Sequence, residues 1–216
     1  MRIPFVFVFL LFLTNLPAQV DTFESARVKA YIQIKDLHEG ILVFRLPSEK
    51  KKLEAYKLKY EGKMESTRYD KLVESTKAER DLDNRAFIEA FQHRWTICPV
   101  YFIYDYDTPK LLNNEKVAIS LDSNLVFRKD IIPYEKSLYI AEFTEFESGM
   151  EAMHIMDFQL NNLKAPFPHY YRVNDNWKLF LSILFPKQSV KKDPEISVRR
   201  WNKSLNRFLL RANKAQ

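Results

Sequence analysis

The sequence predicts a single α/β domain, in which a mixed sheet of about five strands packs against a helical hairpin and an amphipathic C-terminal helix. Three observations lead to this fold class. Short apolar runs of strand composition recur along the chain, and longer segments of helix-forming residues separate them. The last segment, from residue 193 onward, combines a helix-start signal with one apolar stripe. Of the 216 residues, 46% are hydrophobic, which is enough to bury a sizeable core.

The N-terminal segment differs in composition from the rest of the chain. Arg2 precedes an unbroken apolar run from Phe5 to Leu13, and small Ala18 follows. This order is typical of a secretory signal peptide, and a spanning helix would need about 20 apolar residues. We therefore expect residues 1–18 to be a cleaved signal peptide and residues 19–216 to form the domain of an exported, soluble protein, periplasmic or extracellular. An uncleaved anchor is the alternative, and no further membrane span is expected.

Two strands and a helical hairpin are expected first. Residues 30–35 alternate as a strand does, residues 41–46 form a second apolar run, and the five residues between them predict a β-hairpin. Ser48 is the expected N-cap of a helix through Lys59, and residues 64–95 form the second helix of the hairpin. The second half of that helix is expected to be buried through Leu82, Ala86, Phe87, Ala90 and Phe91.

Further strands follow the hairpin. Residues 97–104 are apolar on both faces, which predicts a central strand with Pro99 near its start. Residues 105–114 turn away from the sheet, and residues 138–143 and 153–160 have strand composition. Residues 177–185 are expected to be buried, as either strand or helix.

The C-terminal helix has the clearest pattern. Asp193 is the expected N-cap and Pro194 the first helical residue. The apolar stripe consists of Val198, Trp201, Leu205, Phe208, Leu209 and Ala212, and another face carries Arg199, Lys203, Arg207 and Arg211. Residues 191–216 have a net charge of +6, whereas residues 19–190 have −1. In an exported protein such a helix favours anionic lipid, polysaccharide or an acidic partner over nucleic acid. A solvated helix face is the alternative.

Composition excludes several classes of enzyme. Three scattered glycines cannot form a phosphate loop, a dinucleotide fingerprint or a G-x-S-x-G nucleophile elbow. The single cysteine, Cys98, excludes an internal disulfide and a cysteine-based zinc site. No cofactor is therefore predicted, and no catalytic, cofactor-binding or metal-binding residue is assigned.

Asp105 and Asp107 are the first candidates for chemistry. They follow a strand, where open sheets place Mg²⁺ sites, and their D-x-D pattern is similar to that of haloacid-dehalogenase-type phosphohydrolases. Thr108 stands one residue earlier than in that pattern. A turn is the alternative role for both aspartates.

The remaining candidates each have a structural alternative. His38 is expected in a turn, His93 near a helix end, His154 in a strand and His169 beside a tyrosine pair, with structural roles favoured for all four. Cys98 is expected to be an inert buried thiol, with a nucleophile as the alternative. Tyrosines that can stack on sugar rings or fill the core are Tyr101, Tyr104, Tyr106, Tyr170 and Tyr171.

Five segments carry a family resemblance: residues 37–46, 90–91, 98–104, 166–171 and 198–205. On these segments the chain resembles a family of exported Bacteroidota proteins of uncharacterised function. The resemblance implies an exported protein and implies no activity, cofactor or catalytic residue.

Two functions follow from the sequence, and whether the protein is an enzyme stays open. The first is a non-enzymatic binding or interaction protein of the envelope, whose partner meets the basic C-terminal helix. The second is a hydrolase whose site is assembled by tertiary contacts, possibly with a metal at Asp105 and Asp107. A pocket that joins either aspartate to His169 or to another acid would favour the hydrolase.

Overall fold

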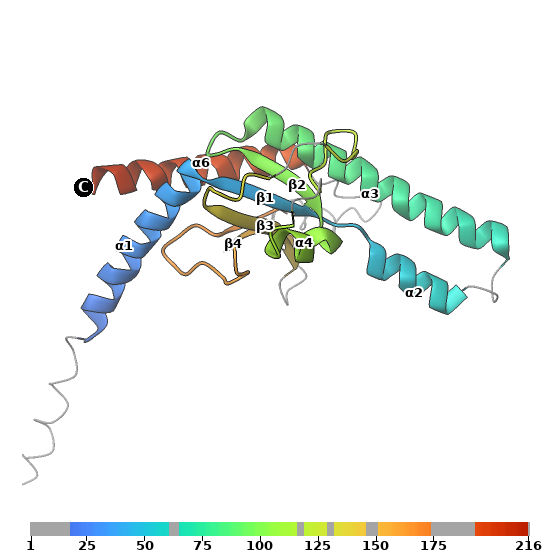
Figure 1. The fold of residues 1–216 in the computed structure, drawn as a ribbon, viewed down its shortest axis with the longest axis horizontal. Helices are drawn as coiled ribbons and strands as arrows, with labels where there is room; N and C mark the ends of the chain where they lie inside the picture. The colour runs from blue at the N-terminus through green and yellow to red at the C-terminus, as the bar shows by residue number, and fades with distance from the viewer. Residues whose placement is uncertain are drawn as a thin grey trace, which may run out of the picture.

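The computed structural model describes residues 18–60, 65–115, 119–128, 132–145, 151–173 and 193–215. In these ranges, α-helices pack around a mixed five-stranded sheet, which confirms the predicted α/β fold (Figure 1). The strands are β1 (Ile41–Leu46), β2 (Val100–Tyr104), β3 (Leu138–Glu145), β4 (Glu151–Asp157) and β5 (Tyr170–Arg172). The helices are α1 (Ala18–Glu39), α2 (Lys50–Tyr60), α3 (Ser66–Arg94), α4 (Thr108–Leu112) and α6 (Pro194–Lys214), with a short 3-10 helix η1 (Asp105–Asp107).

The sheet has the strand order β2-β1-β3-β4-β5. β1 is parallel to both of its neighbours, so that Phe44 lies opposite Phe102 on β2 and Ala141 on β3. β3, β4 and β5 continue the sheet as antiparallel strands. Because β1 is enclosed on both sides, all its residues except Arg45 are buried.

Both faces of the sheet are covered by apolar side chains. α1, α3 and α6 cover one face, where Phe44 of β1 packs in the same core as Ile34, Phe91 and Trp201. α4 and the segments around residues 119 and 132 cover the other face, where Val43 packs with Leu111. The period-2 alternation of strand side chains explains why neighbours such as Val43 and Phe44 belong to different cores.

The connection from β1 to β2 is the helical hairpin expected from the sequence. α2 and α3 extend beyond the end of the sheet, and the second half of α3 returns across it (Figure 1). The buried residues of α3 lie mainly in that second half, as predicted, although Leu82 is 59% exposed. Asn84 fixes the base of the hairpin by donating from Nδ2 to the Pro47 carbonyl oxygen at 3.0 Å.

The predicted strand at residues 30–35 is wrong, and with it the predicted β-hairpin. These residues belong to α1, whose side chains Ala30, Ile34 and Leu37 are buried at helical spacing. Gly40 separates α1 from β1, and a Cβ atom there would overlap the backbone carbonyl groups of Asp36 and Ser137. The strand that completes the five is β5, which the sequence did not predict.

The predicted central position of residues 97–104 is also wrong. Their strand is β2, at the edge of the sheet, with Pro99 directly before it as expected. Both faces of β2 are nevertheless covered, because Phe102 packs in the core under α3 and Ile103 in the core under α4. On its outer side, the Phe102 carbonyl oxygen accepts from the backbone N–H of Leu121 at 2.7 Å.

The C-terminal helix is confirmed in detail. The Asp193 carboxylate caps α6 by accepting from the Ile196 backbone N–H at 3.0 Å, and Pro194 begins the helix. The six residues of the predicted apolar stripe are all buried. The strands predicted at residues 138–143 and 153–160 correspond to β3 and β4, and residues 105–114 turn away from the sheet as η1 and α4.

Two expectations concern residues outside the described ranges. They are the signal peptide, of which the structure describes only Ala18, and the buried segment at residues 177–185. Among the helices that the structure describes, none has the length and apolarity needed to cross a membrane.

Candidate functional site

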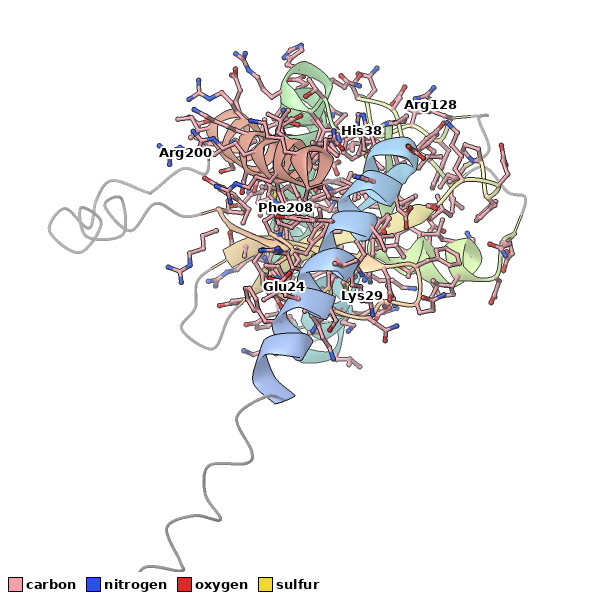
Figure 2. The ribbon with its side chains drawn as sticks, turned by 90° about the vertical axis from the view of Figure 1, so that its left-hand side faces the viewer. Glu24, Lys29, His38, Arg128, Arg200 and Phe208 are labelled. Carbon is pink, nitrogen blue, oxygen red and sulfur yellow. The ribbon has the colours of Figure 1, made fainter. Side chains whose placement is uncertain are left out.

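The first candidate site is a basic groove along α6. It has a volume of about 480 Å³ and is lined by Pro166, Pro168, Arg200, Lys203, Ser204, Arg207, Phe208 and Arg211. Docking of the apolar stripe into the core turns the four basic side chains outward, and all four are exposed. Figure 2 shows α6 beside the N-terminal helix α1, with Arg200 on the side of α6 away from α1.

The charged side chains that line the basic groove are all positive in the described part of the chain. Its described lining holds four cationic side chains and no carboxylate. Among the residues that the structure describes, no carboxylate lies within ion-pair distance of Lys203, Arg207 or Arg211. The row from Arg200 to Arg211 is about 16 Å long at 1.5 Å per helical residue. Pro166 and Pro168 contribute an apolar wall beside the cations.

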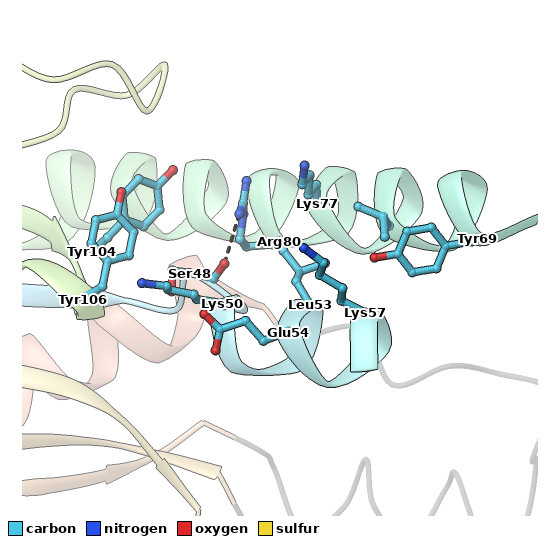
Figure 3. A pocket seen from close by; sticks show the side chains of 11 residues that line it. Ser48, Lys50, Leu53, Glu54, Lys57, Tyr69, Lys77, Arg80, Tyr104 and Tyr106 are labelled. Atoms are coloured by element: carbon cyan, nitrogen blue, oxygen red, sulfur yellow. Dashed lines mark hydrogen bonds between the residues drawn. The ribbon is translucent and has the colours of Figure 1, made fainter. Parts of the chain in front are cut away.

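The second candidate site is a pocket of about 470 Å³ between α2, α3 and the end of β2, which we call the hairpin pocket (Figure 3). Its cations are Lys50 and Lys57 of α2 with Lys77 and Arg80 of α3. Its remaining lining residues are Ser48, Leu53, Glu54, Tyr69, Val73, Tyr104 and Tyr106. The pocket therefore combines four positive charges, one carboxylate, three phenol rings and two aliphatic side chains.

An aromatic pair forms one end of the hairpin pocket. The rings of Tyr104 and Tyr106 are stacked, with centroids 5.3 Å apart and planes inclined by 21°. Cations lie near both rings, Lys50 at 5.9 Å from the centroid of Tyr106 and Arg80 at 5.9 Å from that of Tyr104. Burial is the main cause that raises the pKa of both tyrosines, so both remain neutral phenols at pH 7.

Arg80 holds the hairpin pocket to the sheet. Its Nη1 donates to the Ser48 carbonyl oxygen at 3.0 Å, directly after β1, and its Nε donates to the Asp81 carboxylate at 2.8 Å. Ser48 in turn accepts at Oγ from the backbone N–H of Lys50 at 3.3 Å, where α2 begins. This chain of contacts fixes the end of β1 and the start of α2 relative to the middle of α3.

Asp105 and Asp107 do not form a metal site in the described part of the chain. Asp107 is fully buried, and one of its carboxylate oxygens accepts from Lys110 Nζ at 2.7 Å, a hydrogen bond that raises the pKa of Lys110. No group of three or more histidine, cysteine or acidic side chains with metal-binding geometry occurs among the described residues. His169 precedes β5, at the opposite edge of the sheet and about 19 Å away at 4.8 Å per strand.

The histidines have structural contacts. His38 lies in the last turn of α1, not in a turn between strands, with Nδ1 2.6 Å from the Ile97 carbonyl oxygen. His93 lies near the end of α3 as predicted. His154 is a buried residue of β4 whose ring stacks on Tyr170 at 4.3 Å, with His169 at 5.8 Å. Burial, and secondarily His169, lowers the pKa of His154 to about 4.

The remaining candidates from the sequence are Cys98 and five tyrosines, and two of the tyrosines line the hairpin pocket. Burial raises the pKa of Cys98 to about 12, so the group is a neutral thiol at pH 7 and a poor nucleophile. Tyr101 packs against the core under α4, and Tyr171 against the core under α3. Of the five tyrosines proposed to stack on sugars, only Tyr104 and Tyr106 line the hairpin pocket.

Sequence reasoning missed the cationic residues of the hairpin pocket. The available signal was the composition of α2, in which five lysines stand against the single acid Glu54. Summed over residues 19–190 this local excess disappears, because acidic residues elsewhere cancel it. Charge counted per helix would have identified α2.

Comparison with family models, with curated proteins and with solved structures returns no match for this chain.

Proposed function

We propose that the protein is a non-enzymatic binding protein of the cell envelope, exported by its N-terminal segment, and that the basic groove of α6 holds an acidic polysaccharide. The observation that supports this most is a concave surface in which Lys203, Arg207 and Arg211 lie in a row, with no carboxylate of the described residues within ion-pair distance. Guanidinium groups bind carboxylates through two parallel hydrogen bonds, and three of the four cations are arginines.

The shape of the groove favours a polymer chain over a membrane surface. Helices that bind bilayers insert an apolar face, but the apolar face of α6 is buried in the protein core. The remaining exposed apolar side chain of α6 is Leu210, which is 60% exposed and does not line the groove. A single leucine offers little area for insertion between lipids.

The two walls of the groove suit an acidic sugar chain. The row of cations is about 16 Å long, so several sugar units can lie along it. The cations face the carboxylates of such a chain, while Pro166 and Pro168 offer apolar rings to the carbon faces of the sugars. An acidic peptide would also need partners for its backbone, and no strand residue is among the described lining residues.

Binding to polygalacturonate, a linear uronic-acid polymer, tests this proposal in affinity electrophoresis and calorimetry. The wild type should bind polygalacturonate and not the neutral polymer dextran. The double variant Lys203→Glu/Arg207→Glu should lose binding, whereas Lys29→Glu/Lys71→Glu, with the same change in net charge on α1 and α3, should keep it. Binding to anionic phosphatidylglycerol vesicles or to polyglutamate in place of polygalacturonate would overturn the polysaccharide assignment.

The hydrolase alternative has less support. Asp105 and Asp107 lie at one edge of the sheet and His169 at the other. The Asp107 carboxylate already accepts a hydrogen bond from Lys110. Measurable phosphatase or glycosidase activity that is lost in Asp105→Asn would reverse this preference.

A further inference from the structure

We propose that the hairpin pocket is a second binding site, independent of the basic groove, and that it binds a small organic phosphate that carries a ring. The ring packs on Tyr106, and the phosphate lies among Lys50, Lys57 and Arg80.

The position of the pocket in the fold supports a binding role. Ser48 follows the carboxyl end of β1, and Tyr104 ends the parallel strand β2. The pocket therefore lies outside the carboxyl ends of these two neighbouring parallel strands. This is the end of a parallel sheet at which ligands bind.

The charge of the pocket calls for an anion. Among the described residues, no carboxylate lies within ion-pair distance of Lys50, Lys57 or Lys77. Glu54, the single acid of the lining, forms no ion pair with a described residue either. The two helices contribute two cations each, from opposite sides of the pocket. Like charges gathered in one hollow repel one another, and an anionic ligand removes that cost.

A phosphate ester suits these cations better than a carboxylate. It carries up to two negative charges at pH 7 and three acceptor oxygens, so that cations from both helices can contact it together. Lysine ammonium groups bind phosphate as point charges, without the planar geometry that a carboxylate requires. Arg80 adds a cation whose position is fixed by the Ser48 carbonyl oxygen.

The pair of Tyr104 and Tyr106 indicates that the ligand also carries a ring. Tyr104 stacks on Tyr106, and Tyr106 is 44% exposed, so part of its surface is open to contact with the ring of a ligand. The volume of about 470 Å³ lies within the range of small-molecule sites, about 300–1,000 Å³. Leu53, which lies between the tyrosine pair and Tyr69 in Figure 3, and Val73 supply the aliphatic part of the lining.

Titration of the full chain with phenyl phosphate tests the proposal, with methyl NMR signals of Leu53 and Val73 as the local readout and calorimetry for affinity. Both methyl groups should shift on addition of phenyl phosphate. Inorganic phosphate should bind more weakly, and phenol should not bind measurably. The double variant Lys50→Gln/Lys57→Gln should weaken binding of phenyl phosphate by about tenfold or more, since it removes two charge-assisted contacts.

Three further variants complete the test. Lys51→Gln/Lys59→Gln makes the same change in charge on exposed residues of the same helix that do not line the pocket, and it should leave affinity unchanged. Tyr106→Ala should weaken binding of phenyl phosphate by about threefold to tenfold and leave inorganic phosphate unaffected. The basic-groove variant Lys203→Glu/Arg207→Glu should bind phenyl phosphate normally, which separates this site from the proposed function.

Three results would overturn the proposal. They are unchanged Leu53 and Val73 signals at millimolar phenyl phosphate, equal weakening by the two lysine pairs, and preferential binding of benzoate, which carries a carboxylate in place of the phosphate.

Discussion

Trp201 of α6 packs on Trp95 at the end of α3, with ring centroids 5.4 Å apart, and Phe91 of α3 lies 6.4 Å from the same indole. Trp201 is completely buried. Nearby, the Arg94 guanidinium forms an ion pair with Glu195 at the start of α6. The aromatic contacts therefore dominate the junction of the two helices, since an exposed ion pair contributes at most about 1 kcal/mol.

Replacing Trp201 with alanine should destabilise the protein strongly. Loss of a large buried aromatic side chain costs about 3–5 kcal/mol of unfolding free energy, including the cavity that it leaves. Urea unfolding followed by circular dichroism measures this change. The control Leu210→Ala, on the exposed side of the same helix, should change stability by about 0.5 kcal/mol or less. Equal midpoints for the wild type and Trp201→Ala would show that α6 does not contribute to the core.

Reversing charge in the basic groove should leave the fold intact. Lys203 and Arg207 are exposed, and each reversal should change the unfolding free energy by about 0.5 kcal/mol or less. Urea unfolding of Lys203→Glu/Arg207→Glu should thus resemble that of the wild type. In the intact protein, added salt should weaken binding to polygalacturonate, because it screens exposed charges. Unfolding of the double variant would instead mean that these bases are paired within the structure.

Cys98 should react slowly with thiol reagents. Cys98 is half-buried against the core under α3, and burial raises its pKa to about 12, so the thiolate is scarce at pH 7.5. Labelling with a chromogenic disulfide should be much slower for the native protein than for the protein in urea. Similar rates in the two states would indicate an exposed, activated thiol.

His154 should make stability depend on pH below neutrality. Its pKa is about 4 in the folded protein and about 6.5 when unfolded, so between these values the unfolded state binds more protons. The contribution of neutral His154 to the unfolding free energy is complete above pH 6.5 and is lost as the pH falls toward 4. The difference in pKa corresponds to about 3 kcal/mol at most.

The neutral variant His154→Gln isolates this contribution from that of the carboxylates. The unfolding free energies of wild type and variant should be measured at pH 7 and again near pH 4. Between these two pH values the wild type should lose about 2–3 kcal/mol relative to the variant. A difference between the two proteins that is constant across this range would place the folded-state pKa near its ordinary value.

Sequence predicts the elements of this fold better than their arrangement. β1, α3 and α6 have long or strongly patterned segments with clear end signals, and all three form where predicted. Residues 30–35 were wrongly predicted as a strand because six residues are too few to distinguish the alternation of a strand from one face of a helix. The helix is decided by a contact between residues distant in sequence, Tyr31 and Phe208, whose ring centroids are 5.3 Å apart.

The apolar character of β2 reflects covered faces and carries no information about its place in the sheet. Helices α3 and α4 bury Phe102 and Ile103 on the two faces, so the strand appears central although it lies at the edge. The basic groove was predictable in part, since its cations belong to one helix. The hairpin pocket was not, because its lining comes from three separate segments that the crossover connection brings together.

The packing of α1 on α6 has a consequence for biosynthesis. Tyr31 belongs to the first described helix and Phe208 to the last, so the layer that both helices form is completed only when nearly all of the described chain has left the ribosome. Until then the apolar face of α1, with Ala30, Ile34 and Leu37, lacks its partner and is open to chaperones. The layer of α1 and α6 is therefore the last part of the described core that can form during synthesis of the chain.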